Sequence, residues 1–112
     1  MLPKGLPTLV VFLCAGVTAF AQGTTSRVLG VVQDPSGATI AKASVKLINE
    51  GTKVAFATTS SEAGAYSFEA VQPGLYELQV EAAGFRRFSS RNNQVNIGQP
   101  ATINARLEVG AL

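Results

Sequence analysis

The chain has 112 residues, with nine lysines and arginines against seven aspartates and glutamates, and it contains no histidine. This length suits one domain, and a formal charge of +2 gives no electrostatic reason to expect a nucleic-acid partner. The lack of histidine removes the commonest general base and metal ligand. The single cysteine, Cys14, excludes an internal disulfide framework or zinc cluster. We therefore expect no catalytic site, no metal site and no cofactor.

Residues 1–21 have the pattern of a secretory signal peptide, which we expect to be helical. Lys4 supplies a basic start, residues 9–17 form an apolar centre, and small residues precede the predicted cleavage after Ala21. The alternative, a membrane anchor, needs about 20 apolar residues, and this centre is shorter. We expect export to the periplasm or outer membrane, alternatively secretion, with no membrane span left after cleavage.

Residues 22–26 are predicted to be a flexible polar leader, and residues 27–33 to be the first strand. Gly30, in mid-strand, suggests that another backbone or a large side chain approaches closely. Asp34 begins a sequence with proline second and glycine fourth, which favours a type I turn whose amides bond the carboxylate. A calcium site at Asp34 is the alternative, but a lone carboxylate makes a weak ligand set.

Two further strands are predicted at residues 43–48 and 53–60. In the first, Val45 and Leu47 face inward. The second has little apolar content, which favours an edge position where Lys53 and the threonines limit unwanted pairing.

The clearest alternation lies between residues 64 and 85. Apolar and polar residues alternate twice, which is typical of half-buried antiparallel strands. Proline and glycine at 73 and 74 separate the two runs and favour a tight turn, so we predict a hairpin. The inward positions are Tyr66, Phe68 and Ala70, then Tyr76, Leu78, Val80 and Ala82. The glutamates between them, Glu69, Glu77 and Glu81, are expected to form a solvated face.

An aromatic and basic cluster begins at the last residue of this region and consists of Phe85, Arg86, Arg87 and Phe88. Such a cluster can anchor a protein partner, because arginine and aromatic residues dominate interface hot spots. The favoured alternative is that the two phenylalanines cap the end of the core while the arginines stay in solvent.

The remaining chain is predicted to hold a polar stretch at residues 89–93, a short strand at Val95 and Ile97, and a last strand at residues 101–107. In that last strand Ile103, Ala105 and Leu107 face inward. About seven short strands separated by glycine and proline indicate an all-β sandwich or barrel.

Five sequence blocks then occur in a specific order, at residues 30–40, 43–47, 64–68, 73–78 and 84–85. Together they resemble the carboxypeptidase regulatory-like domain. The resemblance implies a seven-stranded antiparallel Greek-key β-sandwich of the transthyretin or prealbumin type at residues 27–108, with a tail at 109–112. Ser61 stands where the family has aspartate, which is expected to weaken one turn. Related adhesin repeats form an internal isopeptide bond, but Val80 stands at the position of their acid, so we expect none here.

The resemblance extends to the N-terminal extension of Oar-like TonB-dependent outer-membrane receptors. It implies a non-catalytic exported module for protein interaction or structural support, whose partner is a cell-envelope protein or the rest of a larger receptor. The alternative is a carbohydrate-binding module of starch-binding-like fold, with polysaccharide as ligand. Sugar recognition uses exposed aromatic rings, whereas Tyr66, Phe68 and Tyr76 are predicted to be core. A transthyretin-like hydrolase is a weaker hypothesis, because such enzymes rely on histidines.

Overall fold

The computed structural model describes residues 23–110 and contains strands but no helix within that range. The predicted signal peptide, its cleavage site at Ala21 and the first residue of the leader lie outside the described residues. Within them, no helix has the length and apolarity needed to cross a membrane.

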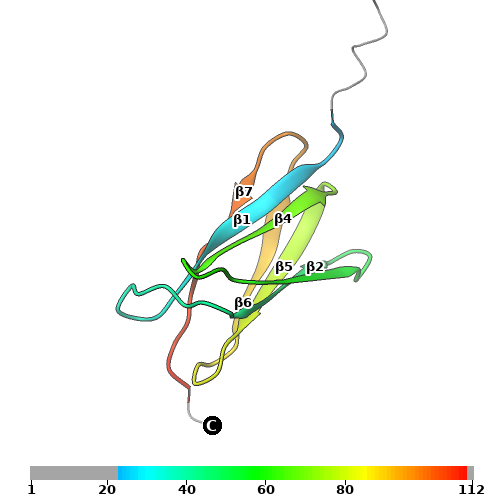
Figure 1. Ribbon diagram of the computed structural model, residues 1–112. Helices are drawn as coiled ribbons and strands as arrows, with labels where there is room; N and C mark the ends of the chain where they lie inside the picture. Colours follow the sequence, from blue (N-terminus) through cyan, green and yellow to red (C-terminus); the bar gives the residue numbers. More distant parts are fainter. Residues whose placement is uncertain (1–22, 111–112) are drawn as a thin grey trace, which may run out of the picture.

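The strands form two sheets that face each other, with β1, β4 and β7 in one layer and β2, β5 and β6 in the other (Figure 1). The predicted all-β sandwich is therefore confirmed. The first sheet contains β4 (Ala65–Val71), β1 (Ser26–Gln33), β7 (Ala101–Thr102) and β8 (Ala105–Arg106). The second sheet contains, in order, β3 (Ala55–Thr59), β2 (Ser44–Asn49), β5 (Gly74–Glu81) and β6 (Phe88–Val95).

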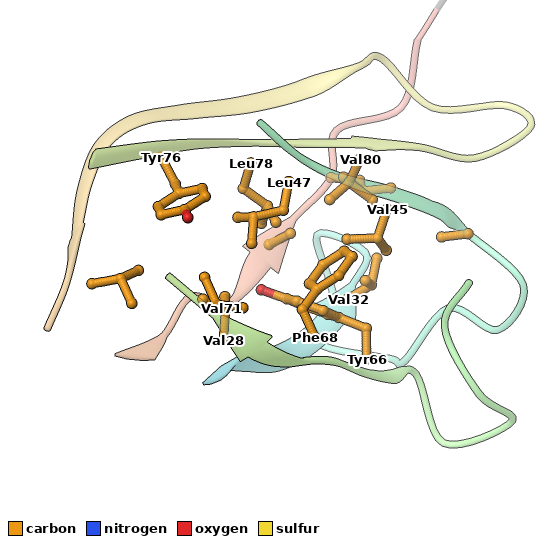
Figure 2. Close-up of a cluster of buried hydrophobic side chains, with 14 residues drawn as sticks. Val28, Val32, Val45, Leu47, Tyr66, Phe68, Val71, Tyr76, Leu78 and Val80 are labelled. Atoms are coloured by element: carbon orange, nitrogen blue, oxygen red, sulfur yellow. The ribbon is translucent and has the colours of Figure 1, made fainter. Parts of the chain in front are cut away.

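The core lies between the sheets, where every second side chain of β1, β2 and β5, and of β4 as far as Phe68, points inward (Figure 2). Tyr66 and Phe68 meet edge to face, with ring centroids 5.9 Å apart. Tyr66 and Tyr76 are both buried, as predicted. Burying one large apolar side chain contributes about 1.5–3 kcal/mol to the stability of the fold. The fully buried side chains of the second sheet include Val45, Leu47, Tyr76, Leu78 and Val80, and they face Val28, Val32 and Val71 of the first sheet.

The predicted hairpin between β4 and β5 is wrong. β4 pairs with β1 in one sheet, while β5 pairs with β2 and β6 in the other, so the chain crosses between layers around Pro73. Alternation shows which face of a strand is buried but not which strand lies beside it, and both strands bury one face in the shared core. Ala70, predicted to face inward, is exposed with φ of 55°, and Val71 is buried instead. The register shift between β1 and β4 at this end is a bulge.

The short strand predicted at Val95 and Ile97 is also wrong. The sixth strand, β6, begins at Phe88 and ends at Val95, and Ile97 lies in the turn that follows. Two half-buried polar residues break the apolar alternation that would have revealed the strand. One of them, Asn93, donates from Nδ2 to the carbonyls of Tyr76 at 3.1 Å and Ser90 at 3.0 Å. These bonds let an amide occupy a position where the pattern predicts an apolar residue.

The last strand was predicted as one continuous run, but it is divided into β7 and β8, and both run parallel to β1. Between them, the carbonyl of Ile103 lies directly against Gly30, which confirms the predicted close backbone approach. The hydroxyl of Tyr66 donates to that same carbonyl at 2.5 Å. Asn104 accepts the amide of Val31 through Oδ1 at 3.0 Å, so its side chain takes the place of a backbone carbonyl at the interruption.

Candidate functional site

Asp34 is a turn residue, as predicted. Its Oδ1 accepts the Ser36 hydroxyl at 2.7 Å, the Ser36 amide at 2.8 Å and the Ala38 amide at 3.0 Å. The hydrogen bond from the Ser36 side chain, followed by the bonds from backbone amides, holds the pKa of this carboxyl below its ordinary value. Within residues 23–110, no three potential metal-ligating side chains lie close enough to form a cation site.

The glutamates of β4 and β5 have partners on the solvated faces of the sheets. Glu77 accepts Gln79 Nε2 at 3.1 Å and the Ser89 hydroxyl at 2.8 Å, and these two bonds lower its pKa. Glu69 lies 3.8 Å from Arg27, and Glu81 forms an ion pair with Arg87. These contacts are those of a solvated polar face, as the sequence predicted.

Ser61, which replaces the aspartate of the family pattern, performs the turn function with its hydroxyl. Its Oγ accepts the amides of Ala63 and Ala65, each at 3.2 Å, and its carbonyl accepts the Gly64 amide at 2.8 Å. A neutral hydroxyl is a weaker acceptor than a carboxylate, so the turn is retained with weaker bonds.

The aromatic and basic cluster has the arrangement that the sequence favoured. Phe85 and Phe88 are half-buried and pack against the core, while Arg86 and Arg87 are exposed. The loop is tied to the end of the chain, because the Arg86 amide donates to the Glu108 carbonyl at 2.8 Å. An isolated bridge also joins Phe85 to Val109. The arginines therefore project from a segment that backbone contacts hold against residues 108–109.

A third arginine lies at the same place, contributed by β8. Arg86, Arg87 and Arg106 line one groove of about 300 Å³, which we call the arginine groove. Arg87 Nε is 2.7 Å from Glu81 Oε2, so one of the three is already paired. Arg86 and Arg106 belong to neither of the two ion pairs found among the described residues. Phe88, Ser89, Leu107 and Glu108 complete its lining.

This arrangement suits an acidic group on a partner. A guanidinium presents several donors in one plane, which matches the two oxygens of a carboxylate. Sequence analysis found Arg86 and Arg87 but missed Arg106, which lies about twenty positions further along the chain. The only signal for it was its outward position in the last predicted strand, and that position says nothing about which loop lies beside it.

These features define a class of protein, namely a two-sheet β-sandwich with a basic groove at one end. A family model for the carboxypeptidase regulatory-like domain matches residues 27–108. The chain belongs to this family. No curated protein sequence matches the chain.

Solved structures share the fold at low sequence identity. The Bacillus anthracis TIE protein matches with a TM-score of 0.66 and 17% identity over 77% of this chain and 17% of its own. A candidate carbohydrate-binding protein from Bacteroides uniformis matches with a TM-score of 0.62 and 18% identity, over 76% and 42%. Hydroxyquinol 1,2-dioxygenase from Pseudomonas putida matches with a TM-score of 0.61 and 10% identity, over 80% and 58%. This chain spans less than two thirds of each of these proteins.

Proposed function

We propose that this protein is a non-catalytic, exported interaction module whose arginine groove contacts acidic groups of a cell-envelope protein or of the rest of a larger receptor. The observation that carries the proposal is the convergence of Arg86, Arg87 and Arg106 on one groove. The complete lack of histidine supports a binding role, because general acid and base chemistry most often uses that residue. Arginine is also enriched where interfaces concentrate their binding energy.

The wider context is part of the same proposal. We expect the chain to be the N-terminal extension of a TonB-dependent outer-membrane receptor, or a free-standing relative, located in the periplasm or at the outer membrane. The predicted signal peptide supports export. Expression with the native N-terminus, followed by cell fractionation and intact-mass measurement, tests this part. Cleavage after Ala21 and recovery from the periplasm are expected, whereas an uncleaved cytoplasmic chain would contradict export.

The groove itself is tested by calorimetric titration with hexaglutamate, a peptide that presents carboxylates without apolar side chains. The wild-type protein is expected to bind it, and R86A/R106A is expected to weaken binding at least about tenfold, because hydrogen bonds to charged groups each contribute about 1.5–3 kcal/mol. The matched control is K46A/K53A, which removes the same charge from exposed lysines outside the groove lining. Equal loss in both double variants would show that only net charge matters and would refute the groove.

Carbohydrate binding is the second candidate function, and the Bacteroides uniformis structure is the observation that favours it. Tyr66, Phe68 and Tyr76 are buried, so a sugar ring would have to stack on another aromatic side chain. Phe56, which is 44% exposed, is the most exposed aromatic residue in the described part of the chain. Retention on soluble starch that disappears in F56S would support this candidate. Wild-type protein that is not retained would reject it.

A further inference from the structure

The edge strand β3 has backbone groups that no other strand in residues 23–110 uses. Asn49 donates its amide to the Val54 carbonyl at 2.9 Å, and the Ser60 amide donates to the Ala43 carbonyl at 3.0 Å. Hydrogen-bonded positions alternate along an antiparallel ladder, so the even-numbered residues from 54 to 60 direct their backbone groups toward β2. The odd-numbered residues, Ala55, Ala57 and Thr59, direct theirs away from the sheet.

Within the described residues, the other sheet edges carry features that discourage pairing. β6 contains Arg91 and a residue with positive φ, Asn92, whose amide is occupied by Glu50 Oε2 at 2.6 Å. β4 ends in the bulge at Ala70, and β7 and β8 have two residues each. β3 has no charge, no proline and no positive φ within its bounds.

Lys53, the charged residue that was expected to limit pairing at this edge, lies just outside β3. It precedes the strand and has φ of 68°, so it does not occupy a pairing position. The side chains next to it are apolar and exposed, with Val54 52% and Phe56 44% accessible. Phe56 lies opposite the buried Leu47 and therefore on the core side of the sheet, yet its side chain remains exposed.

We propose that β3 pairs with β3 of a second copy of this chain, antiparallel and with Ala57 opposite the partner's Ala57. This register joins the odd-numbered residues of both copies, which are the ones with free backbone groups. Each Phe56 then lies opposite the partner's Thr58 and diagonal to the partner's Phe56, within the reach of two aromatic rings on one face. The other face carries only the small side chains of Ala55, Ala57 and Thr59, so nothing blocks the approach.

The charges at the two ends of this segment favour antiparallel pairing. Residues 54–61 are uncharged, with Lys53 at one end and Glu62 at the other. Antiparallel pairing brings Lys53 of one copy toward the Glu62 end of the other, whereas parallel pairing would bring like charges together.

The contact between two such strands is small, because a strand of five residues buries less than the roughly 1,200–2,000 Å² of a stable interface. We therefore expect a weak dimer, with a dissociation constant of roughly 10 μM to 1 mM.

Sedimentation velocity from about 10 μM to 1 mM, combined with amide hydrogen exchange by NMR, tests the pairing. The sedimentation coefficient is expected to rise with concentration. The amides of Ala55, Ala57 and Thr59 are expected to become protected as it rises, while those of Phe56 and Thr58 are protected throughout. A monomer across the whole range, or a dimer without new protection at these three amides, would overturn the proposal.

Two variants locate the contact. A57P removes an amide that faces away from β2 and is expected to weaken the dimer at least about tenfold, because two hydrogen bonds are lost across the two-fold axis. F56K places like charges near that axis and is expected to weaken the dimer as well, which provides a second test if A57P does not fold. The matched control is I97K, since Ile97 is 55% exposed in a turn away from β3. Dimerisation that survives F56K, or that I97K weakens equally, would refute pairing through β3.

Discussion

Gly30 has no side chain, which lets the chain between β7 and β8 lie directly against β1. A Cβ atom there would overlap the carbonyl of Ile103 and approach the Tyr66 hydroxyl to 2.9 Å. Backbone cannot move aside as the end of a flexible side chain can, so G30A is expected to destabilise the protein by about 1–3 kcal/mol or more. Chemical denaturation measures this. The control is G51A, where the nearest atom is 3.4 Å from the added Cβ, and a loss in G51A as large as in G30A would contradict this explanation.

Asp34 links stability to pH. Its folded-state pKa lies below the ordinary value of 3.8, chiefly because the Ser36 hydroxyl bonds the ionised carboxylate. A lowered folded-state pKa stabilises the protein above the ordinary value, and this stabilisation is lost as the pH falls through the folded-state value. Wild type is therefore expected to be more stable than D34N at pH 7, with the difference narrowing below about pH 4. A difference that stays constant down to pH 2 in urea denaturation would contradict the role of the charge.

At the scale of strands, Ser60 joins the start of β2 to the turn after β3. Its buried hydroxyl accepts the Ala43 amide and donates to the Ile40 carbonyl, both at 2.8 Å. S60A leaves both backbone groups without this partner, so we expect a loss of about 2 kcal/mol. Thermal unfolding compares it with S67A, which removes a hydroxyl from an exposed strand position. Equal melting temperatures for the two variants would show that these bonds do not matter.

Sequence analysis predicted which face of each strand is buried more accurately than it predicted which strands pair with one another. The inward positions of β2, β5 and the last strand were correct because alternation records burial directly. The hairpin was wrong because two strands in opposite layers give the same alternation as two paired strands. Most of β6 was missed because Asn93 occupies a half-buried position where the alternation would require an apolar residue. Its side-chain amide bonds backbone carbonyls there.

At the scale of the whole molecule, the candidate site depends on contacts between distant parts of the chain. Arg86 and Arg87 were visible as a local motif, whereas Arg106 reaches the groove only because β8 runs parallel to β1 beside the loop. Strand pairing over such a separation is set by the packing of both sheets, and no local pattern encodes it. Sequence analysis did not predict that the last strand runs parallel to β1.

The measurement that tests the central claim most directly is a map of NMR chemical-shift changes on adding hexaglutamate. The groove predicts that the changes concentrate at Arg86, Arg87, Ser89 and Arg106, which line one surface although they come from separate segments. It also predicts that these changes shrink as salt is added, because exposed charge pairs are screened. Changes centred on Phe56, or spread evenly over all the lysines and arginines, would contradict it.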